Sequence, residues 1–209
     1  MSEILGFKYI YRERSGSTDN LLLLLHGTGG NETDLLPLAK EVAPEWAVIS
    51  PRGRVLENGM PRFFKRLAEG VFDMEDLALQ SADLVQFISE VRKTHNLDKA
   101  RIVAFGFSNG ANIAASILLT YPDIFSGAIL LHPMVPFTPK LLPHLEGIPV
   151  FISGSENDRI VPAEESFRLS EMFQNSGAEV EVSIQNGGHG ITISEIEAVK
   201  VWVNSQNFR

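Results

Sequence analysis

The stretch Ile102-Val103-Ala104-Phe105-Gly106-Phe107-Ser108-Asn109-Gly110 decides the fold. A short, continuously apolar run ends in Gly-x-Ser-x-Gly, and the residues that follow, 111–116, favour a helix. A serine at the tip of so tight a turn needs neighbours without a Cβ atom two positions before and after it, and glycine stands at both. The pattern predicts a buried strand, a turn that exposes Ser108 as a nucleophile, and a helix. The alternative is an ordinary strand-to-helix turn in which the spacing occurs by chance.

Short apolar runs and helical patterns alternate on both sides of this stretch. The runs that predict strands lie at 9–14, 21–26, 46–50, 102–107, 127–131, 150–153 and 180–184. The patterns that predict helices lie at 32–42, 73–95, 109–119, 162–174 and 193–203. Most of the strands are apolar throughout, which is typical of a parallel sheet covered on both faces. We therefore expect one α/β domain over residues 1–209, with a mostly parallel sheet of about seven strands, helices on both faces and no lid domain.

The composition of the 209 residues excludes several classes of protein. Eighteen Lys and Arg against 26 Asp and Glu give a formal net charge of −8. No basic block interrupts this acidic balance, which argues against a nucleic-acid partner. The chain has no cysteine, so a thiolate nucleophile and a cysteine-ligated metal are excluded. A nucleophile in this chain must be an oxygen or an amine.

The N-terminal residues show no export signal or membrane segment. Residues 1–8 contain no cationic segment followed by a long apolar run. The apolar run at 21–25 is far shorter than the roughly 20 residues needed to span a bilayer. We expect a cytoplasmic protein without a membrane partner. A monomer and a homodimer are both compatible with the sequence.

A serine hydroxyl is a weak nucleophile and needs a general base. His189 lies in the glycine-rich stretch 187–190, between the last predicted strand and the last predicted helix, and is the expected base. An acid should follow the strand after the nucleophile's helix, so that the chain order is serine, acid, histidine. Asp158 is preferred over Glu156, because it falls near the crest of the loop after that strand. The alternative is that Asp158 only forms a turn or pairs with Arg159.

The other histidines are expected to have other roles. His132 ends the strand after the nucleophile's helix, near the sheet edge where ligands bind, and we expect it to line the pocket. His26 is expected to brace the loop that follows it. His95 and His144 lie among polar or loop residues and are expected to be exposed to solvent.

The segment His26-Gly27-Thr28-Gly29-Gly30 follows a strand of five leucines. The backbone N–H groups of Thr28 and Asn109 are the expected oxyanion hole. A dinucleotide-binding loop is disfavoured, because the third glycine of its motif falls on Glu32. No phosphate-binding loop and no histidine pair with metal-ligand spacing occurs, so we expect neither a cofactor nor a metal.

The connection 51–71 is long for a compact domain and is the expected substrate-facing loop. Its basic residues are Arg52, Arg54, Arg62, Lys65 and Arg66. In one interpretation, Phe63 and Phe64 supply apolar contact to the substrate while Arg62 or Arg66 pairs with a substrate carboxylate. In the other, of equal weight, the basic side chains form surface pairs with nearby acids, namely Glu57, Glu69, Asp73 and Glu75.

These motifs together resemble the phospholipase/carboxylesterase branch of the α/β-hydrolases, which are small serine esterases and thioesterases without a lid. The resemblance covers nearly the whole chain. The segments that carry it are 25–30, 106–110, 154–162 and 188–190, and segments 59–66 and 131–136 further resemble a bacterial subgroup of small carboxylesterases. The resemblance implies that Ser108 is the nucleophile and His189 the base. It also implies that Asp158 orients His189 and that the amides of Thr28 and Asn109 form the oxyanion hole.

The expected function is hydrolysis of a carboxylic ester or thioester of a small substrate through an acyl-enzyme on Ser108. The substrate in one interpretation bears a carboxylate. Acyl-protein thioesterases carry a Trp-Phe-Asp type motif where this chain has Arg-Phe-Phe-Lys at 62–65, so long-chain substrates are not expected. The alternative function is a catalytically silent ligand-binding protein on the same scaffold.

Overall fold

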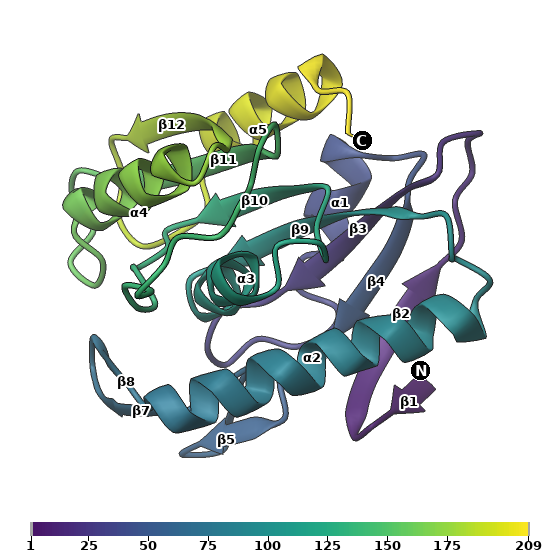
Figure 1. Cartoon of the computed structure of the whole chain (residues 1–209), viewed down its shortest axis with the longest axis horizontal. Helices are drawn as coiled ribbons and strands as arrows, with labels where there is room; N and C mark the ends of the chain where they lie inside the picture. Colours follow the sequence, from purple (N-terminus) through teal and green to yellow (C-terminus); the bar gives the residue numbers. More distant parts are fainter. Residues whose placement is uncertain (1, 209) are drawn as a thin grey trace.

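The computed structural model describes residues 2–208, and its main feature is a sheet of eight strands (Figure 1). Their spatial order is β1-β2-β4-β3-β9-β10-β11-β12. The strands are β1 (Ser2–Ile4), β2 (Phe7–Arg12), β3 (Asn20–Leu25), β4 (Ala47–Pro51), β9 (Arg101–Phe107), β10 (Gly127–Leu131), β11 (Pro149–Ser155) and β12 (Glu179–Gln185). β1 and β2 are antiparallel to their neighbours, and all the other pairs are parallel. The sequence analysis missed β1, because three residues are too few to show a period.

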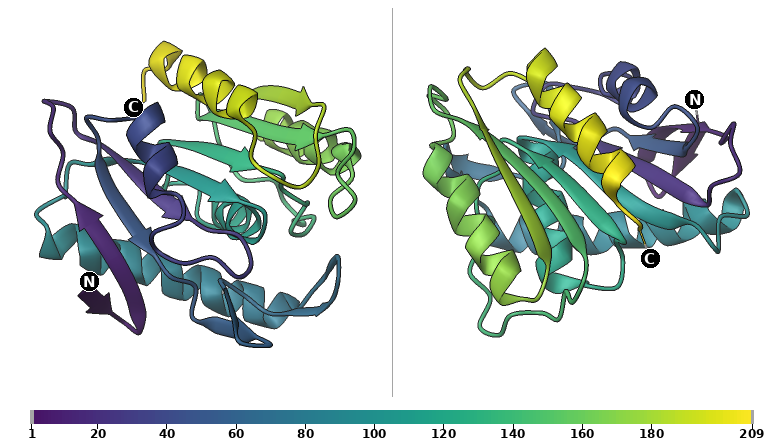
Figure 2. Two further views of the ribbon diagram at one scale, coloured as in Figure 1. Left: turned by 180° about the vertical axis from the view of Figure 1, so that it is seen from behind. Right: turned by 90° about the horizontal axis from the view of Figure 1, so that it is seen from above.

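Five helices cover the two faces of this sheet (Figure 2). They are α1 (Leu36–Val42), α2 (Met74–Thr94), α3 (Asn109–Thr120), α4 (Ala163–Asn175) and α5 (Ile193–Ser205). α2, α3 and α4 contribute to one hydrophobic cluster and α1 and α5 to the other. α1 begins four residues later than predicted, at a first turn that contains Pro37. The α/β-hydrolase-type fold with helices on both faces is confirmed.

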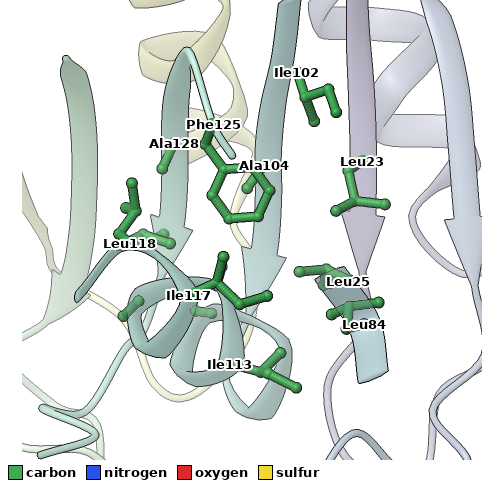
Figure 3. Close-up of a cluster of buried hydrophobic side chains, with 14 of the residues drawn as sticks. Leu23, Leu25, Leu84, Ile102, Ala104, Ile113, Ile117, Leu118, Phe125 and Ala128 are labelled. Atoms are coloured by element: carbon green, nitrogen blue, oxygen red, sulfur yellow. The ribbon is translucent and has the colours of Figure 1, made fainter. Parts of the chain in front are cut away.

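The apolar run of β3 explains why the sheet is buried on both faces. Leu21, Leu23 and Leu25 contribute to the cluster under α2 and α3, whereas Leu22 and Leu24 contribute to the cluster under α1 and α5. Successive side chains of a strand point to opposite faces, so a strand with two buried faces is apolar at every position. Figure 3 shows α3 in front of β9 and β10, with its apolar side chains against those of β9, β10 and the neighbouring β3.

The connection 51–71 contains two small hairpins that the sequence analysis did not predict. The first joins β5 (Val55–Glu57) to β6 (Met60–Arg62), and the second joins β7 (Arg66–Ala68) to β8 (Val71–Phe72). Asn58 and Gly59, at the turn of the first hairpin, both have positive φ, 51° and 82°. Asn-Gly is the preferred pair at such a turn.

The parallel strands end at one edge of the sheet, where ligands bind in folds of this type. The segments that follow β3, β9, β10, β11 and β12 carry His26, Ser108, His132, Asp158 and His189, respectively. The connection 132–147 contains no helix. Among residues 2–208, none of the helices is both long and apolar enough to cross a bilayer.

Candidate active site

Ser108 lies at the turn between β9 and α3 in a strained backbone conformation. Its φ is 51° and its ψ is −114°, a region that residues with a side chain rarely adopt. A Cβ atom on Gly106 would lie 2.6 Å from the carbonyl oxygen of Gly110, and one on Gly110 would lie 1.9 Å from that of Leu25. The Ser108 N–H donates to the carbonyl of Leu131 at 2.9 Å. The two glycines are therefore required by the close approach of backbone.

A chain of hydrogen bonds links Ser108 to both of its predicted partners. Oγ of Ser108 lies 2.9 Å from Nε2 of His189, and Nδ1 of His189 lies 2.7 Å from Oδ2 of Asp158. The Asp158 side chain is fully buried, and that of His189 is 16% exposed. When Nδ1 donates to a carboxylate, a neutral imidazole presents a bare Nε2 to the serine hydroxyl. This arrangement can accept the hydroxyl proton.

Backbone and histidine donors hold Asp158 in place as a carboxylate. Oδ1 accepts hydrogen bonds from the N–H groups of Ile160 and Val161, at 2.8 and 2.9 Å. Burial raises the pKa of Asp158, but the hydrogen bonds from Val161, His189, Ile160 and His132 outweigh it, so the pKa lies below its ordinary value. Asp158 therefore both forms the turn that was its alternative role and contacts His189.

His132, Asp158 and His189 lie close enough together to consider a metal, since one ligand atom from each falls within 4.8 Å of the others. Both histidines, however, direct Nδ1 at the same oxygen, Oδ2 of Asp158, at hydrogen-bond distances of 2.9 and 2.7 Å. A nitrogen whose hydrogen points at a carboxylate has no lone pair for a metal. We therefore assign no metal to this cluster.

The loop that carries Thr28 approaches the start of α3 closely. A Cβ atom on Gly27 would lie 2.8 Å from the ring of Phe107, so glycine allows the approach. Asn109 is the first residue of α3, and its N–H therefore has no acceptor within the helix. Thr28, Asn109 and Ser108 line one pocket. The two N–H groups are candidates for stabilising an oxyanion formed next to Ser108.

Two hollows lie at the site, one lined by Ser108 and the other by His189. The first, which we call the Ser108 pocket, has a free volume of about 40 Å³ and includes in its lining Thr28, Arg62, Arg66, Asn112, Met134 and Val161. The second, which we call the His189 groove, has about 320 Å³ and includes in its lining His26, Thr28, Leu35, Phe107, His189 and Ile191. The hollow beside Ser108 is therefore the narrower of the two.

The side chains of Phe63 and Phe64 do not face either hollow, contrary to one of the two interpretations of this segment. They are 1% and 0% exposed and contribute to the core, where Phe63 contacts His26 and Phe64 contacts Phe72. Burial in the core removes more apolar surface from water than an open pocket does. The backbone N–H of Phe63 donates to Oδ1 of Asn109 at 2.8 Å, and this anchors the 51–71 connection to the first residue of α3.

Arg62 and Arg66 do line the Ser108 pocket, and both also pair with Glu57. Nη1 of Arg62 lies 2.7 Å from Oε2 of Glu57, and Nε of Arg66 lies 2.8 Å from Oε1. The remaining basic residues of the connection pair with acids as well, namely Arg52 with Glu32, Arg54 with Asp83 and Lys65 with Asp76. Ion pairing therefore involves every basic side chain in the segment, while two of them also line the Ser108 pocket.

The prediction that His132 lines the pocket is wrong. The side chain is 1% exposed and lies beside Asp158, with 2.9 Å between Nδ1 and Oδ2. A φ of 51° and a hydrogen bond from its N–H to the carbonyl of Ser153 hold it beside β11. Glu195, which the sequence analysis missed, lies 3.4 Å from Nε2 of His132. Thr192-x-x-Glu195 is a capping box, a signal that predicts the start of α5 but not this contact.

Of the remaining histidines, His26 and His144 lie as predicted and His95 does not. His26 braces the loops as predicted, because its Nε2 accepts the N–H of Gly53 at 3.0 Å. His144 is exposed as predicted, whereas His95 is half-buried. Nε2 of His95 lies 3.0 Å from the hydroxyl of Tyr9, and its ring stacks on that of Tyr11. His95 lines a polar hollow of about 280 Å³ at the opposite end of the strands from Ser108.

Comparison with known proteins places this arrangement in a family. Residues 12–207 match the family described as phospholipase/carboxylesterase. The chain belongs to the phospholipase/carboxylesterase family. MhqD of Bacillus subtilis (strain 168), a protein named as a hydrolase, is 50% identical to this chain over 195 residues. These residues cover 93% of this chain and 96% of MhqD.

Two solved structures resemble this chain over nearly its whole length. A Bacillus cereus carboxylesterase shares 48% sequence identity and a TM-score of 0.92, covering 95% of this chain and 93% of that one. YahD, whose structure was solved with malic acid, shares 32% identity and a TM-score of 0.91, covering 96% of this chain and 100% of its own. The chain is an esterase-type hydrolase with the α/β-hydrolase fold.

In this carboxylesterase-family protein, an ion pair braces the loop that carries Thr28. The Glu32 side chain is 1% exposed, and its two oxygens lie 2.5 and 2.8 Å from Nε and Nη2 of Arg52. The hydrogen bonds from Arg52 lower the pKa of Glu32 more than burial raises it. The pair connects the loop after β3 to the segment after β4.

Arg52→Met should destabilise the protein by about 2 kcal/mol at neutral pH, because it leaves the buried Glu32 carboxylate without its partner. Since the pKa of Glu32 is lowered on folding, the stabilisation is present above the ordinary value of 4.5 and is lost as the pH falls below it. Urea unfolding of both proteins should show a gap near neutral pH that narrows in acid. A gap that does not depend on pH would contradict this account of the pair.

Proposed function

We propose that this protein cleaves a carboxylic ester or thioester of a small substrate through an acyl-enzyme on Ser108. The observation that carries the proposal is the hydrogen-bond chain from Ser108 through His189 to Asp158, at 2.9 and 2.7 Å. The strained turn at Ser108 and the family membership support the same chemistry. We further propose that the chain works as a single domain in the cytoplasm.

The proposed reaction proceeds in two halves. Oγ of Ser108 attacks the carbonyl carbon while Nε2 of His189 takes the hydroxyl proton, and the N–H groups of Thr28 and Asn109 stabilise the resulting oxyanion. The oxyanion collapses, the bond to the leaving oxygen or sulfur breaks, and His189 gives its proton to that atom. A water then attacks the acyl-enzyme with His189 again as base, which releases the acid and restores Ser108. Asp158 holds His189 in the required tautomer throughout.

The two hollows suggest how the substrate is divided. The His189 groove lies beside the general acid and is wide, so we assign the leaving group to it. The Ser108 pocket has about 40 Å³ of free volume and takes the acyl group. A pocket of this size fits a short acyl chain, since one water already needs about 10–15 Å³ on this measure.

We propose further that the acyl group bears a carboxylate. Arg62 and Arg66 line the Ser108 pocket, and Glu57 engages only Nη1 of the first and Nε of the second. The N–H groups on their other terminal nitrogens form no hydrogen bond within residues 2–208, so they are free to bind an anion. The structural relative YahD was solved with malic acid, a compound with two carboxyl groups.

Monoethyl malonate should be cleaved with a kcat/KM about tenfold or more above that of ethyl 3-methylbutanoate, in which methyl groups replace the carboxylate oxygens. A hydrogen bond to a charged group contributes about 1.5–3 kcal/mol, which is at least tenfold. Arg66→Ala should raise KM for the malonate ester alone, and added salt should weaken the preference. Arg62→Ala should act in the same direction, but Arg62 is 3% exposed and its loss also disturbs the fold.

Lys65→Ala is the matched control for Arg66→Ala. Lys65 is the adjacent cation, its side chain is 62% exposed, and it pairs with Asp76 outside the Ser108 pocket. Its substitution should leave both esters unaffected. Equal kcat/KM values of the wild-type protein for the two esters would overturn the proposed acidic preference and leave the arginines as partners of Glu57 alone.

A panel of p-nitrophenyl esters of short acids tests the hydrolase proposal as a whole. Steady turnover that exceeds the background of Ser108→Ala supports it. A ligand-binding protein on the same scaffold would show no turnover above that background across the panel. That result would contradict the proposed function.

A further inference from the structure

The hydrogen-bond chain of the site continues beyond Asp158 into a buried cluster of charge. The side chains of His132, Asp158 and Glu195 are 1%, 0% and 0% exposed. Nδ1 of His132 lies 2.9 Å from Oδ2 of Asp158, and Nε2 lies 3.4 Å from Oε1 of Glu195. The imidazole of His132 therefore lies between two carboxylates, one from the loop after β11 and one from the first turn of α5.

The contacts indicate where the protons of this cluster lie. Both oxygens of Glu195 already accept hydrogen bonds, Oε1 from the hydroxyl of Ser153 and Oε2 from the N–H of Thr192, as expected for a carboxylate. Nδ1 of His132 must carry a hydrogen in order to donate to Asp158. In a neutral ring, Nε2 would then direct a lone pair at the Glu195 carboxylate. In an imidazolium, Nε2 carries a proton 3.4 Å from that carboxylate, which is a favourable electrostatic arrangement although the two groups form no hydrogen bond.

The surroundings of His132 favour the same charge state. Burial lowers the pKa of His132, but Glu195 and Asp158 outweigh it, so the pKa lies above its ordinary value. The other titratable group that faces the ring within residues 2–208 is His189, with 5.3 Å between ring centroids. Phe107 also packs against it and is uncharged. A charged His132 leaves the cluster with one net negative charge instead of two, and buried unpaired charge is costly.

We propose that His132 is a positioning residue that stays an imidazolium at neutral pH, clamped between Asp158 and Glu195, and that it keeps Asp158 charged and aligned with His189. The inference rests on the proposed function, in which Asp158 orients the general base. The cation offsets part of the negative charge beside His189, and so opposes protonation of the base. His132 therefore extends activity to lower pH.

Nitrogen NMR of the histidine side chains tests the charge directly. In the wild-type protein, both ring nitrogens of His132 should be protonated near pH 7.5, with the signal assigned by its loss in His132→Asn. In Glu195→Gln, the ring should lose its proton at a pH lower by about one unit or more, because one of its two carboxylates is gone. A neutral His132 ring in the wild-type protein near pH 7.5 would overturn the inference.

The pH profile of His132→Asn tests the positioning role. The asparagine amide can replace Nδ1 as a donor to Asp158 and tolerates a φ of 51°, but it carries no charge. The acid limb of kcat/KM should move to higher pH by about one unit. His144→Asn, at an exposed histidine, should leave the limb in place. A uniform loss of rate without movement of the limb would reduce His132 to a packing role and overturn the inference.

Failure of this inference and failure of the proposed function give different results. If Ser108→Ala keeps its turnover, the proposed function fails whatever the spectrum of His132 shows. If Ser108→Ala is inactive and His132 is neutral, only the positioning role fails. Should His132→Asn not fold, the spectra of the wild-type protein and of Glu195→Gln decide the question, with the His132 signal assigned by elimination through substitution of the other four histidines by asparagine.

Discussion

Ser108→Ala should lower kcat for a p-nitrophenyl ester by about 10⁶-fold, the size of effect expected when a serine nucleophile is removed. The reason is that Nε2 of His189 has its hydrogen bond with Ser108, and the substitution removes the oxygen that it activates. What remains is the catalysis that binding and the oxyanion donors provide alone. Steady-state kinetics on protein free of host esterases measures the difference.

Urea unfolding supplies the control for this substitution. Alanine removes one oxygen and keeps the Cβ atom at a backbone position with a φ of 51°, so the backbone strain is unchanged. Stability should therefore stay close to that of the wild-type protein. A stable Ser108→Ala protein that loses less than about 100-fold in rate would contradict the nucleophile assignment. Removal of a single oxyanion donor already lowers kcat by about that factor, and loss of the nucleophile must cost more.

Asp158→Asn should lower kcat by about 10⁴-fold, the effect seen when the acid of a serine hydrolase loses its hold on the histidine tautomer. Oδ2 of Asp158 accepts from Nδ1 of His189 at 2.7 Å and from Nδ1 of His132 at 2.9 Å. An amide nitrogen at that position would donate instead, which favours the tautomer of His189 with hydrogen on Nε2. That tautomer cannot take the proton of Ser108.

Glu156→Gln is the matched control, because Glu156 precedes Asp158 on the same loop and is exposed to solvent. It should keep nearly the wild-type rate. If Glu156→Gln lost activity while Asp158→Asn retained it, the acid would be wrongly assigned. The comparison uses the same substrate and pH for both variants, so that only the identity of the carboxylate differs.

The backbone requirements of the site could be predicted from the sequence because they are local. A Cβ atom on Gly106 or on Gly110 would lie only 2.6 or 1.9 Å from a backbone carbonyl oxygen, so glycine is required at both positions. Such a constraint leaves a fixed spacing in the sequence. The buried strands were equally visible, since β3 is covered on both faces and is apolar throughout. The strand β1 and the Asn58-Gly59 hairpin were missed because each involves only a few residues.

The roles of side chains that depend on distant segments could not be predicted. Nothing near His132 in the sequence indicates that Glu195, 63 positions later, faces its ring across a buried space. Phe63 and Phe64 lie in a polar segment, and their burial depends on contacts with His26 and Phe72. The pairing of Arg62 and Arg66 with one acid, Glu57, follows from the hairpin register that brings β5 beside β6.

The central claim is that a single serine, activated by His189, forms a covalent acyl-enzyme. Peptide mapping after reaction with a fluorophosphonate probe tests it most directly, because such a reagent reacts quickly only with an activated hydroxyl that faces oxyanion donors. The account predicts one labelled residue, Ser108, with no label in folded Ser108→Ala and slow labelling of Asp158→Asn. Label on a different residue, or no label on the folded wild-type protein, would contradict it.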